Sequence, residues 1–225
     1  MITTLTFDLD DTLWSVRDVI GRAEKHMFDV LSDQFAPFCE QHTVETFAAI
    51  RQDMMKSEPE RIHNLRQLRR DALALEFNRL GHNDAEAFAD TISETFQKAR
   101  QDVRFWPGVL DTLGQLSQRY RILAITNGTT DILASQAGAY FSGAYRADQF
   151  SQGKPAPDMF EAAMHDHDFS AQQAVHIGDH WREDILAAKS LGFTTAWISD
   201  QPAPGPEADF ALRSVNQLPS VLADL

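Results

Sequence analysis

Short apolar runs alternate with helix-like segments throughout the second half of this chain. The apolar runs are residues 121–126, 174–177, 194–198 and, more briefly, 209–212. Helical patterns occupy residues 109–116, 158–165, 182–191 and 215–222, and another begins at residue 130. Strands that alternate with helices form a parallel sheet with right-handed crossovers and helices on both faces. The sequence therefore predicts an α/β fold with a doubly wound, Rossmann-like parallel sheet, to which the apolar residues 4–9 add a strand.

The long stretch between the first strand and the other strands has a different pattern. It is rich in Ala, Glu, Gln, Arg and Leu, and its apolar residues recur at helical spacing, as at Leu65, Leu68 and Ala72. We expect about four helices here and no strand. The predicted organisation is therefore a catalytic core of residues 1–15 and 103–225, interrupted by an all-helical domain of residues 16–102.

The composition excludes several classes of partner. The 225 residues carry a formal net charge of −13, which argues against nucleic acid, because binding a phosphate backbone requires many Lys and Arg side chains. The same charge disfavours an anionic membrane surface. The single cysteine, Cys39, excludes an internal disulfide, and no leader or long apolar segment is visible, so we expect a cytoplasmic protein that is a monomer or a homodimer.

Two carboxylates follow the first predicted strand. Side chains alternate in an extended segment, so Asp8 and Asp10 should point to one side while Leu9 turns back toward the core. Two like charges this close are unfavourable unless a cation joins them or one of them holds a proton. The alternative is an ordinary Asp-rich turn after a strand.

Three further polar groups follow later strands or precede helices. Thr126-Asn127-Gly128 ends the second strand, where a hydroxyl and the N–H groups of a turn can hold a phosphate. Lys154 stands just before a helix, and Asp179 with Asp184 follows the third strand, where carboxylates could complete an oxygen-rich Mg²⁺ site. Taken singly, these could be an ordinary turn, a solvated lysine and acidic residues that stabilise a helix N-terminus.

The order of these residues resembles the four motifs of the haloacid dehalogenase superfamily. The resemblance runs from Asp8 to Asp184, and the all-helical insertion lies where that family carries a helical cap. It implies that Asp8 is a nucleophile that forms an aspartyl-phosphate, and that Asp10 protonates the leaving group and then activates water. Dehalogenases of the superfamily lack the second aspartate, because a halide leaves without a proton. Asp10 therefore favours the phosphatase branch.

The resemblance also implies how the substrate is held. Mg²⁺ should be bound by Asp8, the Asp10 carbonyl and Asp179, with Asp184 acting through water or by orienting its neighbours. Thr126, the Asn127 N–H and Lys154 should hold the phosphoryl oxygens. In the cap, Arg66 and Arg69 could meet the leaving group or form a solvated basic face, and Trp14 could pack on a planar leaving group or on the cap.

The expected substrate is a small phosphorylated metabolite. The stretches Thr6–Leu13 and Leu123–Gly128 are similar to those of bacterial phosphatases that act on flavin mononucleotide and ribitylaminouracil phosphate. Nucleotide and sugar-phosphate phosphatases remain alternatives, as do a phosphomutase and a phosphate-binding domain without turnover. Sugar phosphomutases usually carry Gly at the position of Asp11, which disfavours that alternative.

Overall fold

The computed structural model describes residues 1–58, 65–203 and 205–224. Contacts between Cα atoms divide the chain into two compact units. The first unit comprises Met1–Val16 and Val103–Leu225, and the second comprises Arg17–Asp102. We call them the sheet unit and the helical unit.

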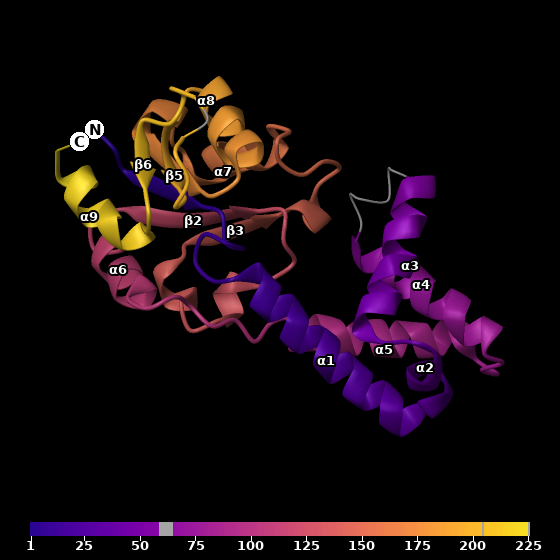
Figure 1. Cartoon of the computed structure of the whole chain (residues 1–225). Coiled ribbons are helices and arrows are strands. Elements are labelled where there is room, and N and C mark those ends of the chain that lie inside the picture. Colours follow the sequence, from indigo (N-terminus) through magenta and orange to yellow (C-terminus); the bar gives the residue numbers. More distant parts are fainter. Residues whose placement is uncertain (59–64, 204, 225) are drawn as a thin grey trace. The chain divides into compact units, whose positions relative to one another are not determined.

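The sheet unit is built on a six-stranded parallel sheet (Figure 1). Its strands are β1 (Thr4–Phe7), β2 (Arg121–Thr126), β3 (Gly143–Arg146), β4 (Ala174–Gly178), β5 (Thr194–Ile198) and β6 (Phe210–Leu212), in the order β3-β2-β1-β4-β5-β6. All four residues of β1 are buried, because this strand lies in the middle of the sheet and pairs with β2 and β4. The predicted doubly wound α/β fold is confirmed.

Helices cover both faces of this sheet. α7 (Asp158–His167) and α8 (Ala187–Ser190) lie on one face, and α6 (Val109–Leu116) and α9 (Leu218–Val221) lie on the other (Figure 1). Leu123 and Ile125 of β2 pack with Phe160 of α7 in a buried apolar cluster. A sheet buried on both faces explains why its strands read as nearly continuous apolar runs rather than as alternating ones.

One local prediction was wrong, and one strand was not predicted. Where a helix was expected from residue 130, the chain forms short 3₁₀ turns at Ile132–Ala134 and Gly138–Tyr140. The chain doubles back here so closely that a Cβ on Gly138 would lie 2.1 Å from the carbonyl oxygen of Leu133. The edge strand β3 was missed, because its four residues are too few to show a periodic pattern.

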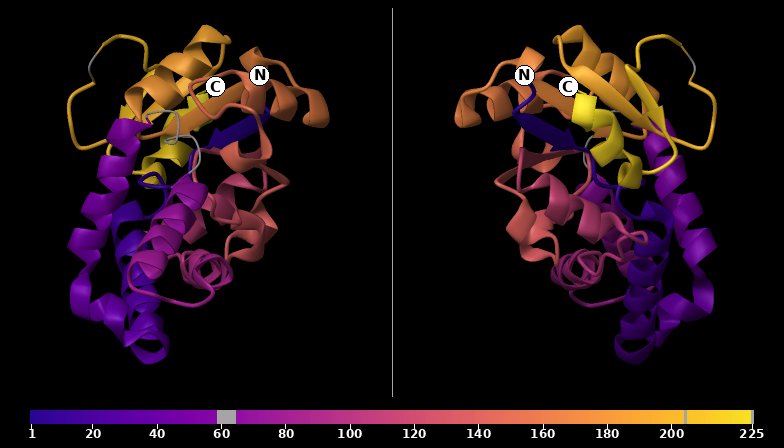
Figure 2. Two further views of the ribbon diagram at one scale, coloured as in Figure 1. Left: turned by 90° about the vertical axis from the view of Figure 1, so that its right-hand side faces the viewer. Right: turned by 90° about the vertical axis from the view of Figure 1, so that its left-hand side faces the viewer.

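The helical unit contains no strand in its described residues (Figure 2). Its helices are α1 (Val16–Gln34, which begins at the unit boundary), α2 (Ala36–Gln41), α3 (Val44–Ser57), α4 (Leu65–Arg79) and α5 (Ala85–Ala99). They enclose a core of their own in which Phe38, Phe77 and Phe96 are fully buried. None of the described helices of the chain is both long enough and apolar enough to cross a membrane.

Candidate active site

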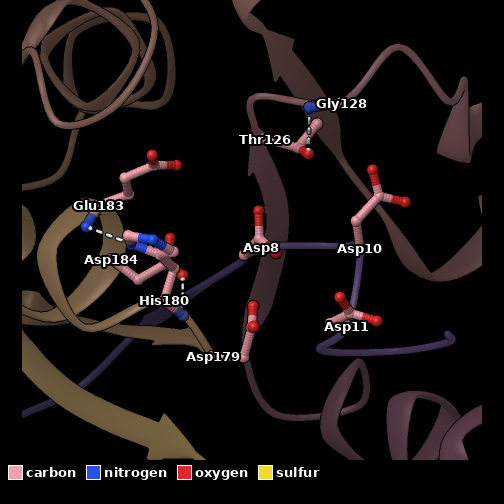
Figure 3. A pocket seen from close by; sticks show the side chains of 9 residues that line it. All are labelled: Asp8, Asp10, Asp11, Thr126, Gly128, Asp179, His180, Glu183 and Asp184. Carbon is pink, nitrogen blue, oxygen red and sulfur yellow. Dashed lines mark hydrogen bonds between the residues drawn. The ribbon is translucent and has the colours of Figure 1, made fainter. Parts of the chain in front are cut away.

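The carboxyl ends of the neighbouring strands β2, β1 and β4 lead into one cavity of about 170 Å³ (Figure 3). Its lining residues are Asp8, Asp10, Asp11, Thr126, Gly128, Asp179, His180, Glu183 and Asp184. Ligands of open α/β folds bind at this edge of the sheet. Six of the nine lining residues are acidic, so the cavity favours a cation or a ligand that arrives with one.

The predicted site residues differ in their position relative to this cavity. Five of them line the cavity, namely Asp8, Asp10, Thr126, Asp179 and Asp184. Lys154 is buried behind the lining and Asn127 lies beside it, whereas Arg66 and Arg69 belong to the helical unit. Sequence reasoning did not name Asp11, His180 and Glu183 as lining residues, although each lies within the stretch of a motif that it used, whereas Gly128 belongs to the phosphate-holding turn that it did name.

The Asp8 carboxylate is fixed through both of its oxygens. Its Oδ1 accepts a hydrogen bond from Lys154 Nζ at 2.8 Å, and its Oδ2 accepts one from Thr12 Oγ1 at 3.3 Å. The residue is only 7% exposed. Burial raises the pKa of this carboxyl well above its ordinary value, the Lys154 ammonium opposes the rise, and the nearby Asp184 carboxylate adds to it. A bound cation would favour the ionised form that a nucleophile requires.

Lys154 lies behind Asp8 with its ammonium completely enclosed. Its Nζ donates to Asp8 Oδ1 at 2.8 Å, to Asp184 Oδ1 at 2.5 Å and to the Ile125 carbonyl at 2.8 Å. These bonds use all three of its protons. Burial opposes the charge on Lys154, but Asp184 and Asp8 outweigh it and raise the pKa of the ammonium above its usual value. Lys154 therefore carries a full positive charge beneath the cavity.

Asp184 is held by the protein on both oxygens. Its Oδ1 also bonds to His176 Nε2 at 3.2 Å, and its Oδ2 accepts from the His180 N–H at 2.9 Å. Burial would raise the pKa of this carboxyl, but Lys154 and His176 reverse the effect and lower it. A carboxylate that already accepts three hydrogen bonds is well suited to hold the lysine in place.

Gly178 leaves the space that Asp184 needs. A Cβ at this position would lie 2.3 Å from both Cγ and Oδ2 of Asp184. Gly178→Ala should therefore displace that carboxylate and the lysine it holds, and lower kcat by about 100-fold, since a shift near 1 Å can cost that much. The matched control is Gly21→Ala in α1, where a Cβ meets nothing within 4 Å. Steady-state kinetics of both variants check this, and wild-type turnover in Gly178→Ala would contradict it.

The Asp10 carboxylate accepts a hydrogen bond from a buried tryptophan. Trp14 Nε1 donates to Asp10 Oδ1 at 2.8 Å. The tryptophan is fully buried and packs edge-on against Phe105, with ring centroids 5.3 Å apart. The ring is therefore buried against Phe105 in this structure rather than exposed to a planar leaving group.

The acidic residues around Asp8 fit a divalent cation. Asp8, Asp179 and Asp184 each place a carboxylate oxygen within 4.8 Å of the others. Burial raises the pKa of Asp179 to about 6, and the charges of Asp184 and Asp11 contribute to the rise. Three carboxylates that repel one another gain from a shared cation, and a donor set made only of oxygen suits Mg²⁺.

Asn127 acts through its side chain in this structure. Its Oδ1 accepts from the Lys154 N–H at 2.7 Å, and its Nδ2 donates to the Lys154 carbonyl at 2.9 Å and to Glu183 Oε2 at 2.7 Å. The amide thus ties the turn after β2 to the loop that carries Lys154. Thr126 Oγ1 accepts from the Gly128 N–H at 2.9 Å, which closes the turn.

The decisive comparison concerns the family. The sequence model of the haloacid dehalogenase-like hydrolases matches residues 2–192, which include every predicted site residue. The chain belongs to this family. The predicted hydrolase of the haloacid dehalogenase superfamily is therefore confirmed.

Relatives of this hydrolase include named phosphatases. The 5-amino-6-(5-phospho-D-ribitylamino)uracil phosphatase YigB of Escherichia coli (strain K12) is 30% identical over 199 residues, covering 88% of this chain and 83% of that protein. The pyrophosphatase PpaX of Listeria monocytogenes is 25% identical, covering 99% and 97%. Among solved structures, a 2-haloacid dehalogenase from Pseudomonas syringae pv. Tomato DC3000 is 33% identical with a TM-score of 0.87, covering 100% and 99%.

Arg66 and Arg69, the two predicted contact residues of the helical unit, have different surroundings in this hydrolase. Arg69 is 8% exposed; its guanidinium lies 3.4 Å from the centroid of the Phe96 ring and donates to Glu24 at 3.2 Å. Burial, followed by the neighbouring Arg51, lowers the pKa of Arg69 to about 9. Arg66 is exposed and borders a separate cavity of about 410 Å³ in the helical unit. A contact of either with a leaving group stays a prediction.

Proposed function

We propose that this chain is a Mg²⁺-dependent phosphomonoesterase that hydrolyses a small phosphorylated metabolite through an aspartyl-phosphate on Asp8. The observation that carries the proposal is the setting of Asp8. It is a buried carboxylate at the end of a central strand, with Lys154 on one oxygen and Asp179 close enough to share a cation. An oxygen nucleophile beside a fixed positive charge and a cation site suits attack on a phosphoryl group.

In the first step, an oxygen of Asp8 attacks phosphorus and the bond from phosphorus to the leaving oxygen breaks. Asp10 gives its proton to that oxygen, so the product leaves as an alcohol and Asp10 becomes a carboxylate. Thr126 and the Asn127 N–H hold the phosphoryl oxygens, where negative charge is concentrated, and the enclosed Lys154 ammonium adds positive charge from beneath the cavity.

In the second step, water attacks the phosphorus of the aspartyl-phosphate. Asp10 accepts a proton from that water, the bond between Asp8 and phosphorus breaks, and inorganic phosphate leaves. Asp8 returns as a carboxylate and Asp10 as an acid, so the cycle is closed. One residue serves both steps because the first step leaves it in the form that the second requires.

The metal would be held by residues already close together. Asp8 and Asp179 offer carboxylate oxygens, Asp10 offers its main-chain carbonyl, and Asp184 completes the acidic group either through water or by holding Lys154. Bound Mg²⁺ would supply positive charge to the phosphoryl oxygens and to the nucleophile.

Two compounds come first among candidate substrates. The relationship to the ribitylaminouracil-phosphate phosphatase supports that compound, and the sequence resemblance adds flavin mononucleotide. In this proposal residues 16–102 form the cap that selects the leaving group, with Arg66 and Arg69 as its candidate contacts. Pyrophosphate enters the panel because a relative that covers 99% of the chain is named for it.

The test is a panel of phosphorylated metabolites assayed for inorganic phosphate, with Mg²⁺ and with EDTA. We expect release with Mg²⁺, loss of activity in EDTA and recovery on adding Mg²⁺ back. The panel contains the two riboflavin-pathway compounds, pyrophosphate, nucleoside monophosphates and sugar phosphates. Mg²⁺ should also raise the Tm of the wild-type protein, because a ligand that binds only the folded state stabilises it.

A second candidate is dehalogenation, favoured by the named activity of the 33% identical Pseudomonas syringae structure. Halide release from a 2-haloacid, unaffected by EDTA and without phosphate release from the panel, would replace the proposal. Phosphoryl transfer to a second sugar phosphate would indicate a phosphomutase. Tight binding of phosphorylated ligands without any turnover would indicate a phosphate-binding domain.

A further inference from the structure

The loop after β1 closes on itself and brings a tryptophan to the side chain of Asp10. The Asp11 N–H donates to the Trp14 carbonyl at 2.8 Å, and the Leu13 N–H donates to the Leu9 carbonyl at 2.9 Å. Asp11 adopts a left-handed conformation with φ of 58°, which Asp tolerates better than most residues. The main chain therefore fixes Trp14 beside Asp10, four residues away.

We propose that Trp14 is a positioning residue that orients Asp10 for proton transfer in both steps of the reaction. The inference rests on the proposed function and deepens it, because it names the group that aims the acid. It stands on the hydrogen bond of 2.8 Å from Trp14 Nε1 to Asp10 Oδ1 and on the complete burial of the tryptophan.

The chemistry of the indole decides which oxygen of Asp10 does the work. An indole N–H donates and cannot accept, so Asp10 Oδ1 must act as an acceptor whether or not the carboxyl group carries a proton. The oxygen of a carboxylic acid that carries no proton is the better acceptor, so the bond from Trp14 to Oδ1 favours the transferable proton on Oδ2. In the first step Oδ2 gives that proton to the leaving oxygen, and in the second it takes one from the attacking water. Asp10 therefore ends the cycle with one proton, as at the start, and Oδ1 keeps its hydrogen bond to Trp14 throughout.

The packing around Trp14 makes it a rigid anchor. Its ring meets Phe105 edge-on at an interplanar angle of 86°, and the Leu13 carbonyl accepts from the Trp106 N–H at 3.0 Å. Phe105 and Trp106, which follow the helical unit in the sequence, thus brace the loop that carries Trp14. A donor whose rotamer is fixed by packing orients its partner without a loss of entropy during the reaction.

The experiment compares leaving groups that differ in their need for a proton. Trp14→Phe keeps an aromatic ring and removes the N–H. The readout is kcat/KM, measured with Mg²⁺, for 4-nitrophenyl phosphate, whose leaving group departs without a proton, and for an alkyl phosphate, whose leaving group requires one. We expect a loss of about 100-fold for the alkyl ester and of about 3-fold or less for the nitrophenyl ester, since general acid catalysis contributes 10²–10⁴.

The second step has its own readout. With 4-nitrophenyl phosphate the variant should show a burst of nitrophenolate equal to the enzyme concentration, followed by slower turnover, because Asp10 must also activate water. A variant that had only lost stability would lower all these rates together through the fraction of folded protein.

The matched control is Phe105→Leu, which loosens the packing of Trp14 and leaves its N–H in place. It should lower Tm without changing the ratio of the two kcat/KM values. If Trp14→Phe does not fold, the tryptophan analogue in which sulfur replaces the indole N–H, placed at position 14 alone, keeps the shape of the ring and removes only this donor. That analogue should show the same preferential loss for the alkyl ester.

Each outcome separates this inference from the proposed function. Equal losses for both esters, with no burst, would assign Trp14 a purely structural role and overturn the inference while leaving the phosphatase intact. The absence of phosphate release by the wild-type protein from either ester would refute the proposed function itself. A selective loss for the alkyl ester in Trp14→Phe but not in Phe105→Leu supports the inference.

Discussion

Asp8→Asn should lower kcat for an aryl phosphate by about 10⁴-fold or more, because an amide cannot form the aspartyl-phosphate and loss of a nucleophile costs this much in comparable enzymes. The fold should persist, since the substitution removes one of several buried like charges and leaves Lys154 paired with Asp184. Steady-state kinetics and thermal denaturation measure the two effects.

Two further measurements make this prediction specific to Asp8. Asp111→Asn, the same substitution at an exposed position in α6, should leave kcat unchanged. Wild-type protein quenched with acid during turnover should carry an alkali-labile phosphoryl group on the peptide that contains Asp8, and Asp8→Asn should not. Substantial turnover in Asp8→Asn would place the nucleophile elsewhere.

Lys154→Met should cause the largest loss of stability of any single change at the site. Methionine has a similar length but no charge, so Asp8 and Asp184 would be left buried without their common cation. Removing one partner of a buried ion pair costs about 3–5 kcal/mol in the free energy of unfolding. We also expect kcat to fall by about 100- to 1000-fold, since the fixed positive charge that lies beneath the cavity and holds Asp8 is lost.

The stability loss should depend on pH in a defined direction. Without Lys154, the ammonium no longer opposes the burial and the Asp184 charge that raise the pKa of Asp8, so the folded state binds more protons than the unfolded state. The free energy of unfolding that the substitution removes should therefore be smaller near pH 5 and increase as the pH rises to about 7.5.

Denaturation in EDTA at the two pH values tests this. Lys189→Met, which breaks a half-exposed ion pair with Asp209, is the matched control and should cost about 1 kcal/mol or less. A loss of the same size in both variants, or one independent of pH, would contradict the role assigned to Lys154.

The parts of the fold that could be predicted are those with a local cause. A strand buried on both faces must be apolar along its length, so β2, β4 and β5 were visible as runs, and α6 was predicted with the bounds that it has. β3 and the turns at 132–140 were not, because their conformation depends on pairing with β2 and on the close approach of Gly138 to Leu133.

The candidate site divides in the same way. Asp8, Asp10, Thr126 and Asp179 could be placed at one edge because the carboxyl ends of adjacent parallel strands meet there. Three hydrogen bonds of the site could not be predicted. They join Trp14 to Asp10, Lys154 to Asn127 and His176 to Asp184. Each depends on a rotamer, and a rotamer is chosen by packing rather than by position in the sequence.

The sequence by itself determined the class of fold, the strand ends that carry chemistry and the family, since these depend on periodicity and on the order of residues along the chain. Only the tertiary structure decided what each carboxylate touches. Lys154 reaches Asp8 across 146 positions and Asp184 across 30, and it meets both beneath the cavity. The order of the motifs identifies the residues that take part. Their hydrogen bonds and pKa values depend on burial and on distances between side chains, which are established only when the strands assemble into a sheet.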